Sequence, residues 1–261
     1  MSFSIVQDHA VWTMLTRERK ALLLDRLAVE GRLVAAALAI ELQVSEDTIR
    51  RDLRELAAEG RLTRVHGGAL PASPTHRPLA ERSAMQTEAK VRLGRRGAEL
   101  IRPGQIVILD GGTTHMALVQ ALPRNLHATI VTHSPTIAAA LEPFERVDVI
   151  LIGGTLLRLS MVALGAATAE AFGRISADLL FLGVTGVHPE AGLTTGHPEE
   201  AELKSRLIRS AAETIVLATP DKIGATSPFQ IAPLASVTAL VTLGERPSWL
   251  PSGLAHLGAG P

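Results

Sequence analysis

Apolar positions in the first seventy residues recur every three to four residues, which is the period of an amphipathic helix. Leu23, Leu24 and Leu27 form one such stripe. The stripe predicts a helix that begins near Thr16, a residue able to cap it, and that ends at Gly31. This part of the chain is therefore expected to be helical.

Two further helices are predicted close behind the first. A short one is expected over 34–41. The turn after it leads to Ser45, a favourable N-cap residue, and Glu46 and Asp47 then lie in the first turn of a third helix. Carboxylates are stabilised there by the positive end of the helix dipole, and the helix is expected to continue to about Glu59.

The third helix has two opposite faces. Ile49, Leu53 and Leu56 fall on one stripe of the helical wheel, and Arg50, Arg51 and Arg54 fall on the other with Asp47. A charged helix face is ordinarily only a solvated surface. Here a strand predicted over Leu62–Val65, with Arg61 and Arg64 at its edge, completes the order of a winged helix-turn-helix. Residues 15–70 carry ten basic and nine acidic side chains, so the indication comes from the distribution of charge.

A second region follows a stretch rich in proline and small residues, GGALPASPTHRP over 67–78, which predicts a linker. A helix is expected near 81–100. The run IVILDGGTTHMALVQAL then predicts an apolar strand that ends in Asp110, a Gly-rich turn and the start of a helix. Backbone N–H groups and threonine hydroxyls over 112–114 would form a cradle for an anion such as phosphate. The turn can equally be plain architecture, because it matches neither a Walker loop nor a dinucleotide fingerprint.

Strand-like runs end at several further places, each followed by small or polar residues. These places are Thr132-His133-Ser134, Gly153-Gly154, 183–186 and 218–222, and helix-like segments such as 199–212 alternate with the runs. The alternation predicts an α/β fold with a mainly parallel sheet, whose ligands bind outside the strand ends. Lys204 and Lys222 are candidate counterions for an anionic ligand, and His115 and His133 are candidate hydrogen-bond donors. A single lysine is more often a solvated surface group, and a histidine packed at a strand end is an equally good interpretation of each histidine.

Composition narrows the possible functions. With 261 residues, 46% of them hydrophobic, the chain is long enough for more than one domain with a buried core. The absence of cysteine excludes disulfides and thiolate chemistry, and the nine histidines are scattered, so neither a metal nor a cofactor is expected. No run approaches the ~20 apolar residues of a membrane span and no signal-peptide pattern opens the chain. A cytoplasmic protein is expected.

The run VSEDTIRRDLREL, followed by EGRLTRVHGGA, strongly resembles the DNA-binding region of the DeoR family of bacterial transcription regulators. The resemblance covers about 16–242, and its start near Thr16 makes Met14 an alternative first residue. It implies a winged helix-turn-helix followed by an effector domain that resembles ribose-5-phosphate isomerase. It also implies a response to phosphorylated sugars or related metabolites.

The resemblance extends to individual positions of the second domain. Matching positions are Asp110, Gly112, Thr113, Thr114, Thr132, Ser134, Gly153, Gly154, residues 192–195, Lys204 and Lys222. Three positions depart from the family pattern, because Gly111 replaces a common Ser, His133 a usual Asn, and Thr219 an Asp. The departures leave the phosphate cradle intact and bear on the contacts to the sugar, and so on the identity of the effector.

These observations predict an N-terminal extension over 1–15, a winged helix-turn-helix over 16–70, a linker over 71–80, an effector domain over 81–250 and a C-terminal tail over 251–261. The residues expected to contact DNA are Ser45, Glu46, Asp47, Thr48, Arg50, Arg51, Arg54, Arg61, Arg64 and His66. Those expected to bind the effector are Asp110, Gly112, Thr113, Thr114, His133, Ser134, Gly154, Thr195, Lys204 and Lys222.

The predicted function is a DNA-binding transcriptional regulator. It would repress a sugar or related catabolic operon until a phosphorylated metabolite released it from double-stranded operator DNA. A rival is a sugar-phosphate isomerase with a DNA-binding appendage, in which Asp110 would be the base and Lys204 or Lys222 a stabiliser, although no second well-placed carboxylate is evident. A third possibility is an architectural DNA binder without an effector. A two-fold pair reads two half-sites, so a homodimer or homotetramer is expected, with contacts mainly in the larger domain.

Overall fold

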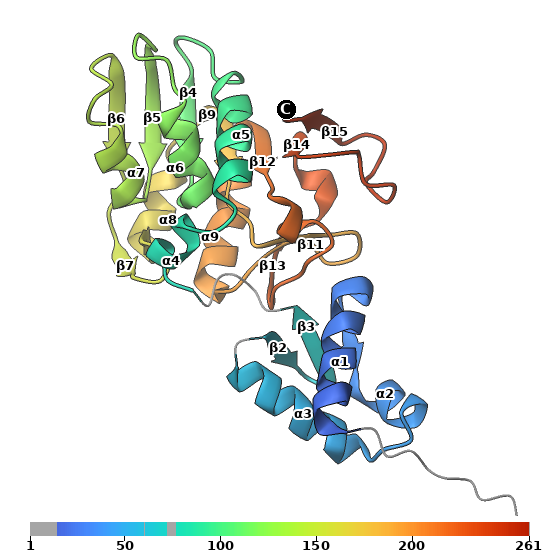
Figure 1. Cartoon of the computed structure of the whole chain (residues 1–261). Coiled ribbons are helices and arrows are strands. Elements are labelled where there is room, and N and C mark those ends of the chain that lie inside the picture. Colours follow the sequence, from blue (N-terminus) through green and yellow to red (C-terminus); the bar gives the residue numbers. More distant parts are fainter. Residues whose placement is uncertain (1–14, 60, 72–76, 261) are drawn as a thin grey trace, which may run out of the picture. The chain divides into compact units, whose positions relative to one another are not determined.

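The computed structural model describes residues 15–59, 61–71 and 77–260. The chain divides into two compact units, Met1–Leu70 and Pro71–Pro261 (Figure 1). The alternative first residue Met14, and all of the expected extension except its last position, lie outside the described residues. None of the described helices is long and apolar enough to cross a membrane.

The described part of the N-terminal unit consists of helices packed beside a small sheet. Its elements are α1 (Thr16–Glu30), β1 (Leu33–Val34), α2 (Ala35–Glu41), α3 (Glu46–Ala58), β2 (Leu62–Val65) and β3 (Gly68–Pro71). The strand order is β1-β3-β2, and β1 pairs with β3 in antiparallel fashion. This order of helices followed by a hairpin is a winged helix-turn-helix, which confirms the predicted fold of this region.

The apolar stripe of α3 lies at the centre of this unit's core. The core includes Ile49, Leu53 and Leu56 of α3 with Leu23 and Leu27 of α1, each at most 3% exposed. Helix α1 ends as predicted at Gly31, whose φ of +70° suits glycine. At its start the N-cap is Leu15 and not Thr16, and the side chain of Glu18 accepts a hydrogen bond from the Leu15 backbone N–H at 3.3 Å.

Regular structure continues further than the sequence suggests. The composition of 67–78 predicts an irregular linker, yet residues 68–71 form strand β3. Gly68 lies opposite Val34, and a Cβ atom at that position would stand 1.8 Å from the carbonyl oxygen of Leu33. Glycine is therefore required by the close approach of two strands, although in the sequence it resembles a chain breaker.

The C-terminal unit is built on a seven-stranded sheet in the order β15-β14-β12-β9-β4-β5-β6, in which all neighbouring strands are parallel. Its elements before the central strand are α4 (Leu79–Ser83), α5 (Thr87–Ala98), β4 (Ile106–Leu109), α6 (Thr113–Gln120), β5 (Ala128–Thr132), α7 (Pro135–Ala140), β6 (Val147–Leu151), β7 (Thr155–Leu157), β8 (Val162–Leu164) and α8 (Ala166–Phe172). Then come β9 (Ala177–Leu182), β10 (Gly186–His188), β11 (Gly192–Thr195), α9 (Pro198–Arg209), β12 (Ala211–Leu217), η2 (Pro220–Lys222), β13 (Phe229–Ala232), η3 (Leu234–Ser236), β14 (Ala239–Thr242) and β15 (Ala255–Gly258). The predicted α/β fold with a parallel sheet is confirmed.

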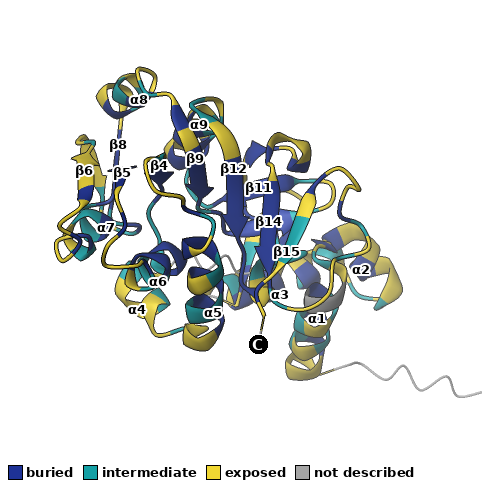
Figure 2. Cartoon of the chain, turned by 90° about the horizontal axis from the view of Figure 1, so that it is seen from above, coloured by how far each residue is buried: buried dark blue, intermediate teal, exposed yellow. Residues whose placement is uncertain are grey.

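Helices cover both faces of this sheet (Figures 1 and 2). One apolar cluster contains Leu180 and Leu182 of β9 with Phe172 of α8 and Leu207 of α9. The cluster on the other face contains Leu179 and Phe181 of β9 with Leu93 of α5 and Leu118 of α6. Successive side chains of a strand point to opposite faces, so a central strand with two covered faces is apolar throughout.

Three boundaries differ from those predicted. The single helix expected near 81–100 is two helices, α4 and α5, because Gln86 between them has a left-handed φ of +52°. The helix expected over 199–212 ends at Arg209, and strand β12 starts directly afterwards. The segment 251–261 is not only a tail, because β15 within it pairs with β14 and forms one edge of the main sheet.

Candidate functional site

Helix α3 presents the predicted arginine face to solvent. Arg50, Arg51 and Arg54 are all exposed, whereas the opposite side of the helix forms the core. Ser45 caps the helix as its sequence predicts, and its Oγ accepts a hydrogen bond from the Thr48 backbone N–H at 3.1 Å. The cap and the apolar stripe together determine which side of α3 remains available for a partner.

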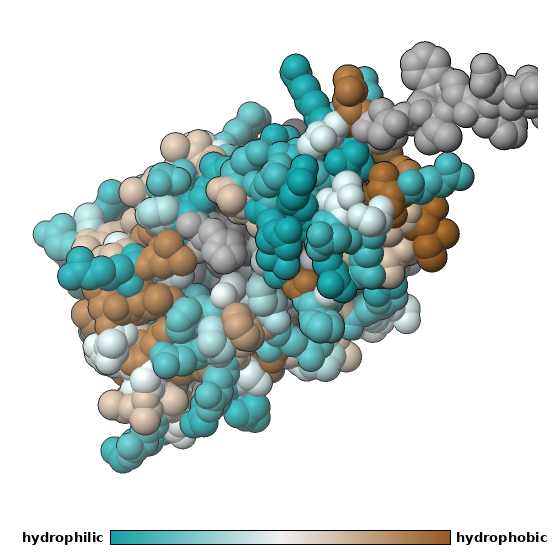
Figure 3. Space-filling view, turned by 90° about the horizontal axis from the view of Figure 1, so that it is seen from below, coloured by the Kyte–Doolittle hydropathy of each residue, from teal (hydrophilic) through white to brown (hydrophobic). Residues whose placement is uncertain are grey.

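The residues around α3 extend this polar surface. Arg50 donates to the Glu46 carboxylate at 2.7 Å. Arg61, Arg64 and His66 are exposed on β2 and its two flanking positions, and α3 packs against β2. The space-filling view shows that hydrophilic side chains dominate this part of the N-terminal unit (Figure 3). All ten residues predicted to contact DNA thus lie on α3, at its cap, on β2 or directly beside β2.

A buried ion pair holds α3 from behind. Two guanidinium nitrogens of Arg19 on α1 donate to the carboxylate of Asp52, Nη2 at 3.2 Å, and the two residues are 5% and 0% exposed. A bidentate pair of this kind sets the orientation of the two helices as well as their contact. Sequence analysis missed the pair because Asp52 follows two exposed arginines and resembles part of the charged surface.

In the C-terminal unit a pocket lies at the carboxyl ends of β4, β9 and β12. Its lining residues are Arg82, Gly111, Gly112, Thr113, Thr114, His115, Ser160, Gly183, Val184, Thr185, Thr195, Glu200, Lys204, Leu217 and Lys222. Six predicted effector-binding residues are among them: Gly112, Thr113, Thr114, Thr195, Lys204 and Lys222. Arg82, Ser160 and Glu200 were not foreseen, because they come from segments distant in sequence.

The start of helix α6 forms one wall of this pocket. Gly112 precedes the helix with a φ of +134°, a backbone conformation that residues with a side chain rarely adopt. Because the N-cap residue is glycine, it provides no side-chain cap to the first turn. The first N–H groups of a helix have no partner within it, and the helix dipole makes this end positive. The turn over 112–114 is therefore suited to an anion, in the arrangement that the sequence predicts.

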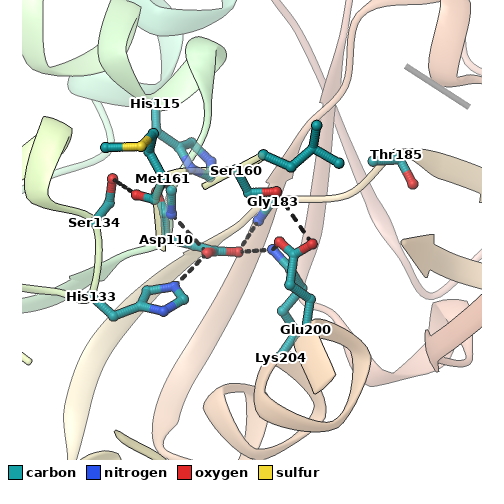
Figure 4. A network of polar contacts seen from close by, with 12 residues as sticks. Asp110, His115, His133, Ser134, Ser160, Met161, Gly183, Thr185, Glu200 and Lys204 are labelled. Carbon is teal, nitrogen blue, oxygen red and sulfur yellow. Dashed lines mark hydrogen bonds and ion pairs between the residues drawn. The ribbon is translucent and has the colours of Figure 1, made fainter. Parts of the chain in front are cut away.

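Asp110, directly below this turn, organises the site from inside. Its carboxylate is completely buried and receives four hydrogen bonds (Figure 4). The donors are Lys204 Nζ at 2.5 Å, the Gly111 N–H at 2.7 Å, the Gly183 N–H at 2.8 Å and His133 Nε2 at 2.9 Å. Burial by itself raises the pKa of Asp110, but the charge of Lys204 and the hydrogen bond and charge of His133 outweigh burial and hold the pKa below its usual range. Asp110 is a fixed anion that positions two strand ends and a helix.

His133 replaces a usual Asn of the family and completes this network. Its Nδ1 lies 2.7 Å from the carbonyl oxygen of Ala163, and its Nε2 faces the Asp110 carboxylate. The ring also packs edge-on against Phe172 at 5.7 Å between centroids. The departure from Asn thus serves the interior of the site and not its ligand-facing wall.

His115 contacts the same residue from α6. Its Nδ1 donates to the Asp110 carbonyl oxygen at 2.7 Å, which leaves Nε2 as the acceptor of a neutral ring. Burial lowers the pKa of His115 to about 4, although the Asp110 charge and this hydrogen bond oppose the shift. His115 is therefore neutral at physiological pH and adds no charge to the pocket.

Three basic side chains line the pocket, Arg82, Lys204 and Lys222. Burial lowers the pKa of Lys222 to about 8; the Asp221 carboxylate opposes the shift, and the charges of Arg82, Lys90 and Lys204 add to it. Within the described residues the ammonium of Lys222 has no hydrogen bond or ion pair closer than 4 Å. A bound anion would offset this repulsion and stabilise the charged form of Lys222.

A buried carboxylate lies beside these cations. Glu200, on the same face of α9 as Lys204, is 5% exposed, and its Oε2 accepts a hydrogen bond from the Ser160 hydroxyl at 3.3 Å (Figure 4). Its other oxygen lies 3.9 Å from Lys204 Nζ. A carboxylate beside hydroxyls accepts hydrogen bonds from a polyhydroxylated ligand. No group of three or more His, Asp or Glu side chains in the described ranges is placed to hold a metal ion.

Four predicted effector-binding residues do not line the pocket: Asp110, His133, Ser134 and Gly154. Ser134 donates to the Met161 carbonyl oxygen at 3.1 Å and is fully buried. A Cβ on Gly154 would lie 2.0 Å from Thr168 Oγ1, so this glycine permits a close approach of the loop to α8. Their polar and small side chains support the site without facing it, a distinction that spacing along a chain does not contain.

The two units match two domain models of one family. Residues 19–75 match the DeoR-like helix-turn-helix domain, and residues 85–243 match the DeoR C terminal sensor domain. The chain belongs to the DeoR family. It is a DNA-binding transcriptional regulator with a C-terminal sensor domain, as the resemblance of its N-terminal motif implies. At Gly111 of this DeoR-family regulator, a Cβ atom would stand 2.3 Å from Val162 Cγ1.

The similarity to known relatives extends over most of this chain and most of each relative. The HTH-type transcriptional regulator GlpR of Haloferax volcanii is 36% identical over 234 residues, 88% of this chain and 91% of the relative. The HTH-type transcriptional repressor GlcR of Bacillus subtilis is 33% identical, with 88% and 89% covered. The glycerol-3-phosphate regulon repressor of Escherichia coli is 30% identical, with 86% and 90% covered. Transcriptional repressors are thus among the relatives of this DeoR-family chain.

Solved structures show a weaker likeness. Ribose 5-phosphate isomerase A of Methanocaldococcus jannaschii is 15% identical with a TM-score of 0.39, over 52% of this chain and 54% of that one. The sorbitol operon regulator SorC of Klebsiella pneumoniae is 14% identical with a TM-score of 0.40, over 85% and 96%. Neither likeness identifies what this DeoR-family protein binds.

Proposed function

We propose that this protein represses a sugar or related catabolic operon, and that a phosphorylated metabolite in the C-terminal pocket releases it from double-stranded operator DNA. The observation that supports a phosphorylated effector is the lining of the pocket, which combines the uncapped start of α6 with Arg82, Lys204 and Lys222. A phosphate monoester carries a charge of about −1.5 to −2 at neutral pH and offers three acceptor oxygens. It therefore matches both the N–H groups and the cations.

The polar residues that line the pocket together with these cations suit the rest of such a metabolite. Glu200, Ser160, Thr185 and Thr195 provide a carboxylate and hydroxyl groups within the same pocket. Such groups pair with the hydroxyls of a sugar or polyol and would leave an apolar ligand with unpaired polar partners. The name of the Escherichia coli relative, a glycerol-3-phosphate regulon repressor, supports a small phosphorylated polyol as one candidate.

The rival isomerase function has less support. An enzyme of that class needs a base within reach of its substrate, and Asp110 is fully buried and bonded to four donors. Glu200 is the carboxylate among the residues that line the pocket, and it already accepts a hydrogen bond from Ser160 and lies beside Lys204. A turnover assay with pentose and hexose phosphates distinguishes the two functions, because sustained isomerisation would contradict a pure regulator.

Binding to the upstream DNA of the protein's own gene tests the regulatory function directly. Footprinting is done with and without a panel of inorganic phosphate, glycerol 3-phosphate, a pentose phosphate and hexose phosphates. One phosphorylated member should weaken the footprint, and its unphosphorylated counterpart should not. A footprint that no member alters, together with the absence of any ligand-induced thermal shift, would favour an architectural DNA binder.

The effector and the operator must oppose one another reciprocally. A ligand shifts an equilibrium between two states only through its difference in affinity for them. If the effector favours the DNA-free state, operator DNA weakens effector binding by the same factor, typically about 5- to 150-fold. Titration of the effector in the presence and absence of operator DNA measures this factor.

Replacing Lys222 with alanine should give a repressor that binds its operator normally and is released only at higher effector concentration. The substitution removes a cation that has no close protein partner, so the loss falls on the bound anion. A hydrogen bond to a charged group contributes ~1.5–3 kcal/mol, so release should require about 10- to 150-fold more effector. Fluorescence anisotropy of labelled operator DNA during effector titration measures the midpoint.

Arg209→Ala is the matched control, because Arg209 is an exposed cation near the end of α9 and does not line the pocket. It should leave the release midpoint unchanged. Release of Lys222→Ala at the wild-type effector concentration would show that the effector binds elsewhere.

Assembly follows from the DNA partner. A single helix-turn-helix contacts few base pairs, whereas a two-fold pair reads half-sites about 34–36 Å apart and multiplies specificity. The proposed active form is therefore a homodimer or homotetramer, with its main contacts in the larger C-terminal unit. The cytoplasm, where operator DNA is accessible, is the proposed location.

A further inference from the structure

Helix α4 lies, along the sequence, between the two regions that match the family's domain models. The matched helix-turn-helix region ends at residue 75 and the matched sensor region begins at residue 85, so α4 (Leu79–Ser83) belongs to neither. No residue of α4 is fully buried. Its position therefore depends on polar contacts more than on packing, which is typical of segments with low local stability.

Two such contacts attach α4 to the pocket. The Leu79 N–H donates to the Leu159 carbonyl oxygen at 3.1 Å, and Arg82 Nη2 donates to the same oxygen at 3.3 Å. Leu159 lies in the β7–β8 turn beside Ser160, whose hydroxyl bonds Glu200. Lys90 of α5 holds the other end of α4, because its ammonium donates to the Arg82 and Met85 carbonyl oxygens.

Arg82 has an unused donor in the pocket wall. Its Nε is buried and has no hydrogen-bond partner, and burial lowers the pKa of Arg82 from its ordinary value although Glu200 opposes the shift. A buried guanidinium donor without a partner is costly. Lys222, whose pKa the charge of Arg82 lowers, lines the same pocket. An anion held by both side chains would satisfy the donor and offset the repulsion.

We propose that Arg82 donates from Nε to the phosphate of the effector, and that α4 thereby carries the occupancy of the pocket to the linker. The inference rests on the proposed function and names the residue that reads the phosphate. Because α4 has few other anchors, one added charge-assisted contact changes how firmly it is held, and so changes the segment that leads to the DNA-binding unit. Arg82 acts here as a binding and positioning residue.

Hydrogen exchange of the full-length protein tests this coupling. Backbone amides of residues 79–85 and 112–116 are followed with and without inorganic phosphate, the group common to all candidate effectors, and with glycerol 3-phosphate. Both segments should exchange more slowly with ligand in the wild type. Arg82→Gln should lose protection over 79–85 and bind ligand about 10- to 150-fold more weakly, the effect of losing a hydrogen bond to a charged group. Arg95→Gln, which removes an exposed arginine of α5 outside the pocket, should behave as wild type.

The outcomes separate the inference from the proposed function. Protection over 112–116 without protection over 79–85 would leave the pocket in place and overturn the role of Arg82. Equal protection of both segments in Arg82→Gln and wild type would overturn it as well. Protection of neither segment would contradict the pocket itself, and the inference with it.

A separate observation concerns the free edge of the main sheet at β6. In Figure 1 this strand is the outermost one, and Figure 2 shows it as largely exposed. Val149, Ile150 and Leu151 are 39%, 45% and 50% exposed. Within the described residues, the backbone of 148–151 forms hydrogen bonds only with β5. The edge thus has unpaired N–H and C=O groups next to consecutive apolar side chains.

This edge resembles the interior of a sheet. Solvent-facing edge strands are normally protected by charged side chains, proline or a bulge, and a strand with apolar residues on both faces is normally paired on both sides. The charged residue of β6 is Asp148 near its start, and the three residues after it are apolar. The opposite edge strand, β15, has fewer large apolar residues. It contains His256, whose Nε2 forms a hydrogen bond with the Thr242 hydroxyl at 2.6 Å. The contrast between the two edges favours a partner strand at β6.

We infer that β6 pairs with β6 of a second copy of this chain. A two-fold axis places the same strand opposite itself in antiparallel orientation, so one apolar edge covers the other and both sheets continue. The proposed two-fold reading of operator DNA requires a symmetric pair, which makes a second copy the favoured occupant.

Light scattering at micromolar concentration tests the surface with the double variant Ile150→Lys and Leu151→Lys. The molar mass of the wild type should be at least that of a dimer. The molar mass of the variant assembly should be half the wild-type value, because charges on an edge strand oppose strand pairing. The control Ile40→Lys places lysine at a position 81% exposed in the N-terminal unit and should retain the wild-type mass. If the variant folds poorly, hydrogen exchange of β6 in the wild type should slow with rising protein concentration. A monomeric wild type, or an unchanged mass of the variant with no concentration dependence in β6, would overturn the inference.

Discussion

Replacing Arg50, Arg51 and Arg54 together with alanine should abolish specific operator binding while the protein remains folded. All three side chains are exposed on the face of α3 opposite its apolar core stripe. Each lost contact to a base is worth ~1–3 kcal/mol with relaxed specificity at that base, and each lost phosphate contact lowers the salt slope by about 1. Three such losses together should weaken binding by at least about 100-fold.

Anisotropy titrations of operator DNA at several salt concentrations measure both effects. The matched control replaces three exposed arginines of the C-terminal unit, Arg174, Arg206 and Arg209, and removes the same charge. The control distinguishes loss of a specific face from loss of general positive charge. Circular dichroism should show an unchanged fold, because the stripe of Ile49, Leu53 and Leu56 and the Arg19–Asp52 pair remain. Unaltered affinity and salt dependence in the folded triple variant would exclude this face.

Replacing Lys204 with methionine should destabilise the C-terminal unit strongly. The ammonium lies 2.5 Å from a completely buried carboxylate, and its removal leaves Asp110 with three donors but without its nearest cation. Breaking a buried pair by removing one partner costs ~3–5 kcal/mol of the free energy of unfolding. Urea unfolding followed by circular dichroism and tryptophan fluorescence measures the change.

The pH dependence of this loss of stability shows whether the charge of Asp110 causes it. In the wild type the pKa of Asp110 lies below its usual range, so its contribution is present above the ordinary Asp pKa and is lost as pH falls. Without Lys204 the pKa of Asp110 should rise, and the penalty in the variant should shrink toward acidic pH, where the carboxyl is protonated. Asp110→Asn in the Lys204→Met background should recover part of the lost stability. An equal penalty at acidic and neutral pH would contradict this account.

Lys20→Met is the matched control for an exposed lysine pair. Lys20 lies 2.8 Å from Glu55, a distance similar to that of the buried pair, but both side chains are partly exposed. Water solvates and screens the charges of such a pair, so its loss should change stability little. The comparison isolates burial as the origin of the large effect at Lys204.

The local features of this fold follow from short stretches of sequence. Helix α3 is determined by the Ser45 cap, the period of Ile49, Leu53 and Leu56, and carboxylates in its first turn, all of which act within a few residues. The apolar run that ends at Asp110 and the turn to α6 are equally local. The exposed arginine face of α3 and the glycine turn before α6 could therefore be predicted from the sequence alone.

Only the tertiary structure decides which polar groups face the pocket and which support it. Asp110 resembles a catalytic base in the sequence. In the fold, three donors distant along the chain, from His133, Gly183 and Lys204, join the neighbouring Gly111 N–H around its carboxylate and make it a buried anion. Arg82, Ser160 and Glu200 reach one pocket from three separate segments. Gly68 is required only because β1 passes close to it. Spacing along a chain determines which residues share a face of one element, whereas burial, pairing and pKa depend on neighbours that only the folded chain brings together.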